Sequence, residues 1–221
     1  MSHSLLALIS MLLPWPIRRW ILCRFCGYQI HPSARIGLSW VAPVELIMEA
    51  DSRIGGFTVV KSLQRLEMGR GAMIGRGNWI TGYPLNGTSF RHQPLRRSEL
   101  ILQDQSAITH RHIIDCTGGV VIGEFTTIAG YHSQILTHSI DLVENRQSSS
   151  AVEIGHHCFI GTNCVILGGS RLPDCSVLGA KALLNHVFTS THQLYAGVPA
   201  VPVKGLSPEL PYFHRRQGVV E

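Results

Sequence analysis

The stretch IGHHCFIGTNCVILGGSRLPDCSVLGAKALL, residues 154–184, repeats an aliphatic residue at every sixth position. An amphipathic helix would place apolar residues three and four positions apart, and a half-buried strand would alternate them. Neither template fits a period of six, which is typical of a repeat architecture. The aliphatic positions are Ile154, Ile160, Ile166, Leu172, Leu178 and Leu184, and small residues follow four positions later at Cys158, Cys164, Ser170, Ser176 and Ala182.

Each group of six residues is predicted to form one short strand and one turn. The position after the aliphatic residue holds residues that suit a bend, namely Gly155, Gly161, Pro173 and Gly179. Three such groups would complete one triangular coil of about 18 residues, with copies of the inward aliphatic side chain stacked about 4.8 Å apart. The sequence therefore predicts an all-β fold, a parallel β-helix.

The same period continues, less regularly, through much of the chain. It breaks at residues 83–100 and 138–151, which contain polar and turn residues and are predicted to be loops extruded from the coils. Long loops on a rigid scaffold tend to carry function. The weaker sets are Ile30 and Ile36; Ile54, Val60 and Leu66; Met68, Ile74 and Ile80; Leu102, Ile108, Ile114 and Val120; and, after a slip of two positions, Ile122 and Ile128.

Composition is that of one domain with a continuous core, because 45% of the 221 residues are hydrophobic and only 15% are charged. The net charge is +5, and 16 of the 19 basic residues are arginine. Arginine favours bidentate contact with phosphate or carboxylate, so the excess indicates an anionic ligand or a membrane surface. A nucleic acid partner is not expected, because the basic residues are scattered and no basic and aromatic motif is present.

The six cysteines do not indicate a disulfide scaffold. Cys158 and Cys164 lie in the inward track of small residues, where packing is the expected role. Cys23 and Cys26 form a single CxxC without a second pair, so no zinc site is expected there. The pattern favours a reducing compartment.

The N-terminal segment is apolar from Leu5 to Leu13 and then alternates arginines with aromatic residues. The apolar run is too short to span about 30 Å of hydrocarbon, and no positive charge precedes it as in a secretory signal. Two interpretations remain for residues 1–26. The segment is either a helix lying in the membrane interface, or a helix packed across the end or side of the solenoid.

The hexads, the segment THSID at 137–141 and the ending YAGVPAVPVKGL at 195–206 resemble the left-handed β-helix hexapeptide acyltransferases. The resemblance is greatest to sugar and exopolysaccharide O-acetyltransferases of the maltose and nodulation-factor type. It covers about 30–206 and is most specific over 120–206. It implies a left-handed coil, a homotrimer, acetyl-CoA or another acyl-CoA held between two subunits, and a histidine general base.

The resulting domain organisation has three parts. Residues 1–29 form an apolar and basic helical segment, residues 30–206 the β-helix acyltransferase domain, and residues 207–221 a C-terminal tail.

The resemblance assigns the general base to His138, because the family places its base where a coil breaks into the extruded loop, in a Thr-His-x-x-Asp context. The chemistry requires such a group, since a sugar hydroxyl is a poor nucleophile near neutral pH and an imidazole accepts its proton during attack on a thioester. Asp141 is expected to orient the loop or the imidazole. The tetrahedral oxyanion is expected to be stabilised by a backbone N–H near the loop.

Three further residues are candidates for the acceptor pocket. His110 and His112 are two positions apart on a predicted strand and would point to the same face, and His112 is expected to line the pocket. Asn78 and Trp79 are further candidates, because a Trp face commonly stacks on a sugar ring, although a subunit contact explains Trp79 equally well.

For the donor, an extended pantetheine arm needs small residues and backbone amides, which Gly161, Gly179 and Ala180 would supply in the final coils. Pro199 lies in GVPA, which resembles the closing motif of the family. The family commonly has a cation directly after that motif, whereas Val201 follows here. Lys204 and Lys181 are the expected phosphate contacts.

Two other classes of function remain as alternatives. One branch of the superfamily hydrates CO₂ at a trimeric interface zinc with a His-x4-His pair, but no two histidines here are five positions apart. His132 and His138 are six apart and could stack. No metal is therefore expected. The second alternative is a non-catalytic scaffold, in which His138 would be dispensable.

The favoured function is transfer of an acyl group from acyl-CoA to a hydroxyl of a saccharide or lipid-linked saccharide, in exopolysaccharide or capsule assembly. The location expected from this function and from the N-terminal segment is cytoplasmic, with peripheral contact at the cytoplasmic face of the membrane.

Overall fold

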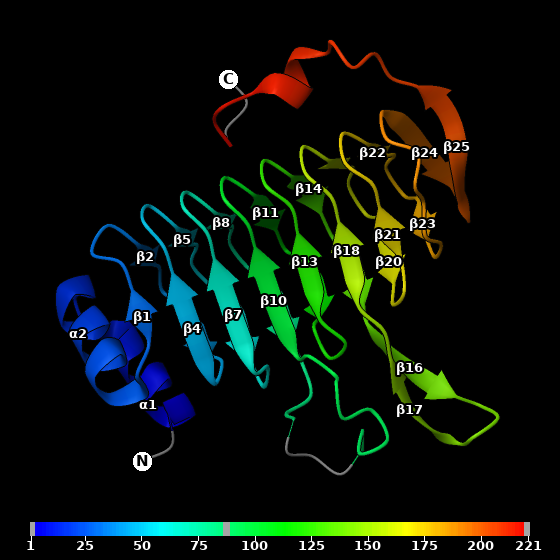
Figure 1. Ribbon diagram of the computed structural model, residues 1–221. Helices are drawn as coiled ribbons and strands as arrows, with labels where there is room; N and C mark the ends of the chain where they lie inside the picture. The colour runs from blue at the N-terminus through cyan, green and yellow to red at the C-terminus, as the bar shows by residue number, and fades with distance from the viewer. Residues whose placement is uncertain (1–2, 86–88, 219–221) are drawn as a thin grey trace.

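Short strands follow one another around three parallel sheets, A, B and C, which form the three faces of a coil (Figure 1). The structure is a computed structural model that describes residues 3–85 and 89–218. Residues 1–2 of the N-terminal segment, 86–88 of the first predicted loop and 219–221 of the tail lie outside this part. The β-helix prediction is confirmed by the parallel pairing of each strand with its counterparts in neighbouring coils.

The chain visits the faces in a fixed order, A then B then C, and repeats it from coil to coil. Sheet A contains β1 (Gln29–Ile30), β4 (Glu45–Met48), β7 (Arg65–Met68), β10 (Glu99–Leu102), β13 (Val120–Ile122), β18 (Val152–Ile154) and β21 (Arg171–Leu172). Sheet B contains β2 (Arg35–Ile36), β5 (Arg53–Ile54), β8 (Met73–Ile74), β11 (Ala107–His110), β14 (Thr127–Tyr131), β19 (Phe159–Ile160), β22 (Val177–Leu178), β24 (Gln193–Gly197) and β25 (Ala200–Gly205). Sheet C contains β3 (Trp40–Ala42), β6 (Val59–Lys61), β9 (Trp79–Thr81), β12 (Ile113–Asp115), β15 (Gln134–Leu136), β20 (Val165–Leu167) and β23 (Leu183–Leu184).

The aliphatic residues of the six-residue period form the core. Each of the six aliphatic positions in residues 154–184 is at most 2% exposed. The small residues of the period are buried beside them, so that Cys158 and Cys164 are free thiols packed in the interior. Burial also raises the pKa of the Cys158 thiol to about 12, which keeps it protonated and unreactive.

The slip of two in the period has its cause in sheet A. Strands such as β13 turn both Val120 and Ile122 inward, so this face contributes two core residues where the others contribute one. Coil length varies at the corners as well. Ile36 pairs with Ile54, 18 positions on, whereas Ile54 pairs with Ile74, 20 positions on, although the A strand of each of these coils has four residues.

Two insertions interrupt this count at corners of the coil. The segment between β9 and β10 is the first predicted loop, which ends where β10 begins at Glu99. The second predicted loop is instead an antiparallel hairpin of β16 (His138–Asp141) and β17 (Arg146–Ser149). Both project from the same side of the coil in Figure 1.

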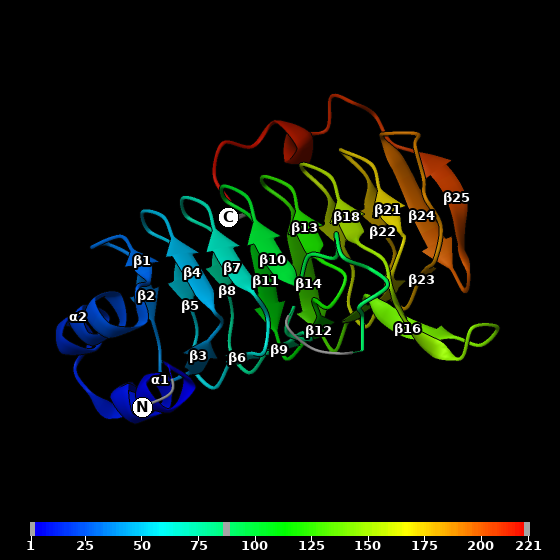
Figure 2. The same cartoon turned by 60° about the horizontal axis from the view of Figure 1, so that its bottom comes forward.

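Two helices cover the N-terminal end of the coil, α1 (His3–Ile9) and α2 (Trp15–Cys26), with a 3-10 turn at Ser10–Leu12 between them (Figure 2). Ala7 and Leu22 are fully buried against the first coil. The packing interpretation of this segment is therefore confirmed. None of the helices in the described residues is both long enough and apolar enough to span a bilayer.

Arg18 performs for the first coil the hydrogen bonding that a preceding coil performs elsewhere. Later coils show the normal pattern, in which the carbonyls of Ile54, Gly55 and Thr58 accept from Gly37 N, Ser39 Oγ and Trp40 N of the coil before.

No coil precedes the first one, and Arg18 supplies the missing hydrogen-bond donors. Its guanidinium donates to the equivalent carbonyls of Gly37 at 2.7 Å, Ser39 at 2.6 Å and Ile36 at 3.5 Å. Arg19 does the same for Ile30, at 2.6 and 3.0 Å. Burial lowers the pKa of Arg18 to about 10, so it stays charged at neutral pH.

At the other end, the antiparallel pair β24 and β25 closes sheet B, and the chain then turns back over this sheet. The short helix Pro211–His214 lies on this path. Tyr212 donates its hydroxyl to Cys158 O at 3.1 Å, and Gly218 N donates to Gln105 Oε1 at 2.9 Å. The tail is thus folded onto the solenoid.

Replacing Arg18 by Met is expected to lower the free energy of unfolding by about 3 kcal/mol or more, because the carbonyls of Ile36, Gly37 and Ser39, two of them in buried contacts, lose their charged donor. Urea denaturation measures this loss. The exposed neighbour Arg24 provides the matched control, and Arg24→Met is expected to change stability by no more than about 0.5 kcal/mol. Equal losses of unfolding free energy in the two variants would contradict the role of Arg18 as hydrogen-bond donor to the first coil.

Candidate active site

His138 stands at the point where the chain leaves the coil. Thr137 is buried at the end of β15, and His138 opens the hairpin opposite Ser149. Its side chain is 37% exposed, so the imidazole is open to solvent on one side. His138 therefore lies where the coil breaks into the hairpin.

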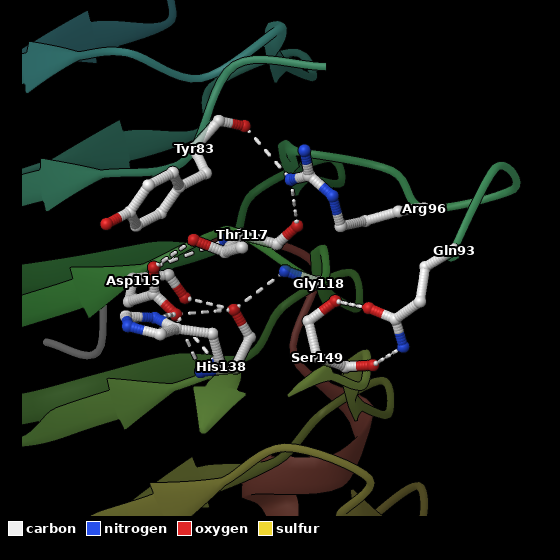
Figure 3. A network of polar contacts seen from close by, with 9 residues as sticks. Tyr83, Gln93, Arg96, Asp115, Thr117, Gly118, His138 and Ser149 are labelled. Atoms are coloured by element: carbon white, nitrogen blue, oxygen red, sulfur yellow. Dashed lines mark hydrogen bonds and ion pairs between the residues drawn. The ribbon is translucent and has the colours of Figure 1, made fainter. Parts of the chain in front are cut away.

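The imidazole is held by a carboxylate from the preceding coil. His138 Nδ1 lies 2.9 Å from Asp115 Oδ2, and the side chains point toward each other in Figure 3. An ionised carboxylate only accepts, so Nδ1 carries the proton and donates. The other ring nitrogen, Nε2, makes no hydrogen bond within residues 3–85 and 89–218 and carries the free lone pair.

Asp115 is itself fixed by donors from both sides. Oδ1 accepts from the hydroxyl of Thr117 at 2.5 Å, and Oδ2 accepts from Thr137 N at 2.9 Å, Thr137 Oγ1 at 2.7 Å and His138 N at 3.0 Å. Burial alone would raise the pKa of the Asp115 carboxyl, but the hydrogen bonds from Thr117, Thr137 and His138 outweigh it and hold this pKa below its usual range. Asp115 is therefore ionised at neutral pH.

Arg96 holds the loop between β9 and β10 beside the His138 and Asp115 side chains. The guanidinium donates to the carbonyls of Tyr83, Pro84 and Thr117, each at 2.9 Å, and stacks on Phe90 at 4.4 Å. This places the Tyr83 ring edge-on to the His138 imidazole, with ring centroids 5.8 Å apart.

A second connection joins the same loop to the hairpin. Gln93 Nε2 donates to Ser149 O at 3.0 Å, and the Ser149 hydroxyl donates to Gln93 Oε1 at 2.8 Å (Figure 3). The loop and the hairpin are therefore joined to each other beside His138.

Two hollows adjoin these insertions and share Ser149 and Ser150 in their lining. The one that contains His138 measures about 360 Å³ and runs along Leu136, Leu167 and Gly168 on sheet C. The other measures about 590 Å³ and lies over sheet A, where apolar residues such as Leu95 and Val121 line it together with polar ones. The charged and amide side chains of its lining are Gln93, Arg96, Arg97, Glu99 and Glu153.

Two roles were predicted for Asp141, orientation of the loop or of the imidazole, and the structure shows the first and not the second. Asp141 lies at the far end of β16, where its Oδ1 accepts from Val143 N and Glu144 N at 3.0 and 3.1 Å and shapes the hairpin turn. Asp115 occupies the orienting position instead. In the sequence, Asp115 could have been recognised only as a carboxylate at the end of a strand one coil before Thr137. The register between β12 and β15 brings Asp115 next to Thr137 and His138.

The prediction that His112 lines the acceptor pocket is also wrong. Its side chain is interior, with Nδ1 accepting from Ser133 N at 3.1 Å and Nε2 lying 3.0 Å from Thr109 Oγ1. The expected shared face with His110 fails as well, because Arg111 adopts a left-handed turn conformation between them, with φ of 55°.

Asn78 is likewise structural. It is 1% exposed, its amide donates to Thr109 O at 2.9 Å, and its Oδ1 accepts from the backbone of His112 at 2.8 Å. It joins consecutive coils and cannot reach a saccharide.

Trp79 is 47% exposed on the outer face of sheet C, where Lys61 lies over its ring at 5.3 Å. It pairs with Ile113 and so lies in a different column from Leu136 beside His138. The structure keeps it available for contact but does not bring it into the His138 site.

The two histidines of the metal alternative lie apart, because His132 precedes β15 and His138 follows it. Within residues 3–85 and 89–218, no three His, Cys, Asp or Glu side chains are grouped as metal ligands.

The small residues predicted to hold the donor are required by the coil itself. A Cβ on Gly161 would lie 2.6 Å from Ala180 N, and one on Gly179 would lie 2.9 Å from the Cβ of Ala196. These glycines therefore permit close stacking of coils, and they give no sign of an open cradle.

The remaining donor candidates are exposed. Ala180 and Lys181 lie at the corner between sheets B and C, Pro199 follows a cis peptide bond in the turn between β24 and β25, and Lys204 lies on β25. Sheet C separates this corner from His138 within one chain.

Neither a protein-family model nor a curated protein matches this chain. Solved structures do match it. The polysialic acid O-acetyltransferase OatWY superposes with a TM-score of 0.55 at 18% identity, over 80% of this chain and 84% of that chain. The chain has the fold of the hexapeptide-repeat acetyltransferases.

Two other matches are similar in extent. A hexapeptide-repeat acetyltransferase from Vibrio cholerae, complexed with acetyl coenzyme A, gives a TM-score of 0.49 at 18% identity over 93% of this chain and 87% of its own. A variant of AntD, an N-acyltransferase from Bacillus cereus in complex with dTDP and coenzyme A, gives 0.48 at 12% identity over 85% and 86%. At such identities the likeness to the hexapeptide-repeat fold concerns the backbone.

The buried state of His112 makes stability depend on pH. Burial, followed by the nearby His110 and His132, lowers its pKa to about 4, whereas an unfolded histidine titrates near about 6.5. Between these values the unfolded chain binds the proton more readily, so stability is expected to fall by up to about 3 kcal/mol as pH decreases from 6.5 to 4.

Urea denaturation across this pH window tests the assignment. The difference in stability between wild type and His112→Gln is expected to shrink toward low pH, because the variant lacks the titrating group. The exposed His92 serves as the control, and His92→Gln is expected to keep the wild-type slope. A slope in His112→Gln as steep as in wild type would contradict it.

Proposed function

We propose that this chain is an acyl-CoA-dependent O-acyltransferase, with acetyl as the simplest acyl group, that acts on a saccharide hydroxyl. The observation that carries the proposal is the His138 imidazole, oriented through Nδ1 by an ionised Asp115 and free at Nε2 beside a surface hollow. The fold shared with an O-acetyltransferase of a polysaccharide supports the reaction class.

The proposed reaction is a direct transfer. The acceptor hydroxyl oxygen attacks the thioester carbon while its proton passes to His138 Nε2, as expected for a general base. The tetrahedral oxyanion collapses, the carbon–sulfur bond breaks, and the coenzyme A thiolate takes the proton from the imidazolium. Asp115 stabilises this imidazolium and keeps Nε2 turned to the substrates.

The hollows suggest how the substrates divide around the base. The hollow beside His138 reaches Leu167 and Gly168 of the next coil, and the coils that follow carry Lys181 and Lys204. We assign the acyl-CoA arm to this side, with the two lysines as phosphate contacts. The larger hollow over sheet A contains donors and acceptors of both charges, such as Arg97 and Glu99, which suit a saccharide.

The remaining features of the proposal follow the family resemblance. They are a left-handed coil, a homotrimer with acyl-CoA between two subunits, and a role in exopolysaccharide or capsule assembly on the cytoplasmic side. The exposure of Trp79 and Ile113 on sheet C, each 47%, supports contact between subunits on that face.

Replacing His138 by Ala is expected to reduce transfer from labelled acetyl-CoA to a panel of saccharide acceptors by about 10²–10⁴, the usual contribution of a general base. The exposed His186 supplies a control, and His186→Ala is expected to retain wild-type transfer. Transfer by His138→Ala within tenfold of wild type would remove His138 as the base.

Asp115→Asn tests the orienting role, because an amide can donate to Nδ1 and so place the proton on Nε2. We expect kcat to fall at least about 100-fold, with KM for acetyl-CoA nearly unchanged. A purely structural role for Asp115 would instead give wild-type kcat per folded molecule, so circular dichroism is recorded alongside.

A further inference from the structure

The outer surface of the N-terminal helices is apolar although their inner surface is fixed to the coil. Leu12 is 85% exposed and Trp20 60%, while Ala7 and Leu22 on the opposite side are fully buried. The other exposed apolar side chains of this surface are Leu8, Ile9, Leu13, Ile17 and Phe25. We call the exposed set, together with Leu12 and Trp20, the N-terminal apolar surface.

This surface has the pattern of an interfacial helix. In α1 and its continuation the exposed positions 8, 9 and 12 recur at helical spacing, so they share one side. Trp20 packs edge-on against Phe25 with ring centroids 5.7 Å apart, and the Arg24 guanidinium lies 5.7 Å from the Phe25 ring. Aromatic rings beside an arginine suit the headgroup level of a bilayer.

Charge selects the partner. The first acidic residue of the chain is Glu45, so both helices and the first strands carry only positive charge. Arg24 is exposed, and Arg35 on the first coil is exposed as well. A surface that combines apolar side chains with uncompensated positive charge complements anionic lipid headgroups.

Rigid attachment makes the surface a docking face. Arg18 and Arg19 tie α2 to the carbonyls of the first coil, and Trp40 Nε1 donates to Ser4 O of α1 at 3.2 Å. The helices therefore need no unfolding to present Leu12 and Trp20. We propose that the N-terminal apolar surface docks this protein peripherally on an anionic membrane, independently of its catalytic site.

Vesicle cosedimentation with the full chain tests the proposal. Wild type is expected to bind phosphatidylcholine vesicles containing one quarter phosphatidylglycerol, and to bind pure phosphatidylcholine vesicles more weakly. Leu12→Glu/Trp20→Glu is expected to weaken binding more than tenfold. Arg24→Gln is expected to weaken binding to the anionic vesicles about fivefold and to reduce the effect of salt.

Val187→Glu/Val203→Glu is the matched control, because these side chains are 60% and 59% exposed away from the helices. It is expected to bind as wild type does. All variants change exposed positions, and their thermal unfolding is expected to match that of wild type. A loss of binding with unchanged thermal unfolding is then not caused by a loss of fold.

Three results would overturn the proposal: no binding of wild type to anionic vesicles, equal binding by the Leu12→Glu/Trp20→Glu variant, or an oligomer in sedimentation velocity that the variant alone abolishes without any vesicle binding. The last result would mean that a second copy of the chain covers the surface. Transfer from acetyl-CoA to a soluble saccharide is expected to stay unchanged in the variant, which separates this test from that of the proposed reaction.

Discussion

The site depends on one buried carboxylate, Asp115, which accepts hydrogen bonds from the backbone and from the His138 imidazole at the same time. It accepts the backbone N–H groups of Thr137 and His138 where the chain leaves the coil, and it holds Nδ1 of the His138 imidazole. Residues that leave a coil lose the neighbouring strand as a hydrogen-bonding partner, and buried N–H groups require a substitute. The carboxylate that accepts the N–H groups at the start of the hairpin is thus also the one that sets the tautomer of His138.

The same constraint explains both ends of the molecule. A solenoid leaves unpaired backbone groups wherever the stack of coils stops, and at each end another part of the chain pairs with them. At the start Arg18 and Arg19 take the place of a preceding coil, and at the far end the β24 and β25 pair closes sheet B. Because α2 must bring its arginines to the coil, its opposite side is left to face outward, which produces the N-terminal apolar surface.

The period of six predicted the coil, its core and the break at His138, because these follow from local spacing. Asp115 was missed because it lies 23 positions from His138, and only the register between β12 and β15 brings the two together. Asp141 was chosen because the resemblance has an Asp three positions after the His, but β16 carries it to the hairpin turn, where it orients the loop and not the imidazole. In the sequence, Gly161 and Gly179 are equally consistent with contact to a pantetheine arm and with close stacking of coils. The structure indicates stacking, because a Cβ added to Gly161 or Gly179 would lie 2.6 or 2.9 Å from an atom of the next coil. His112 and Asn78 were misjudged because the turns that hold them direct both side chains inward, where they form hydrogen bonds between coils.

The tautomer of His138 is the most direct test of this account. Two-bond proton–nitrogen correlation spectra of protein labelled with ¹⁵N-histidine, with His138 assigned by comparison with the His138→Ala variant, report which ring nitrogen carries the proton above the titration of the ring. The account predicts a proton on Nδ1 and a bare Nε2. A proton on Nε2 in the wild-type protein would contradict it.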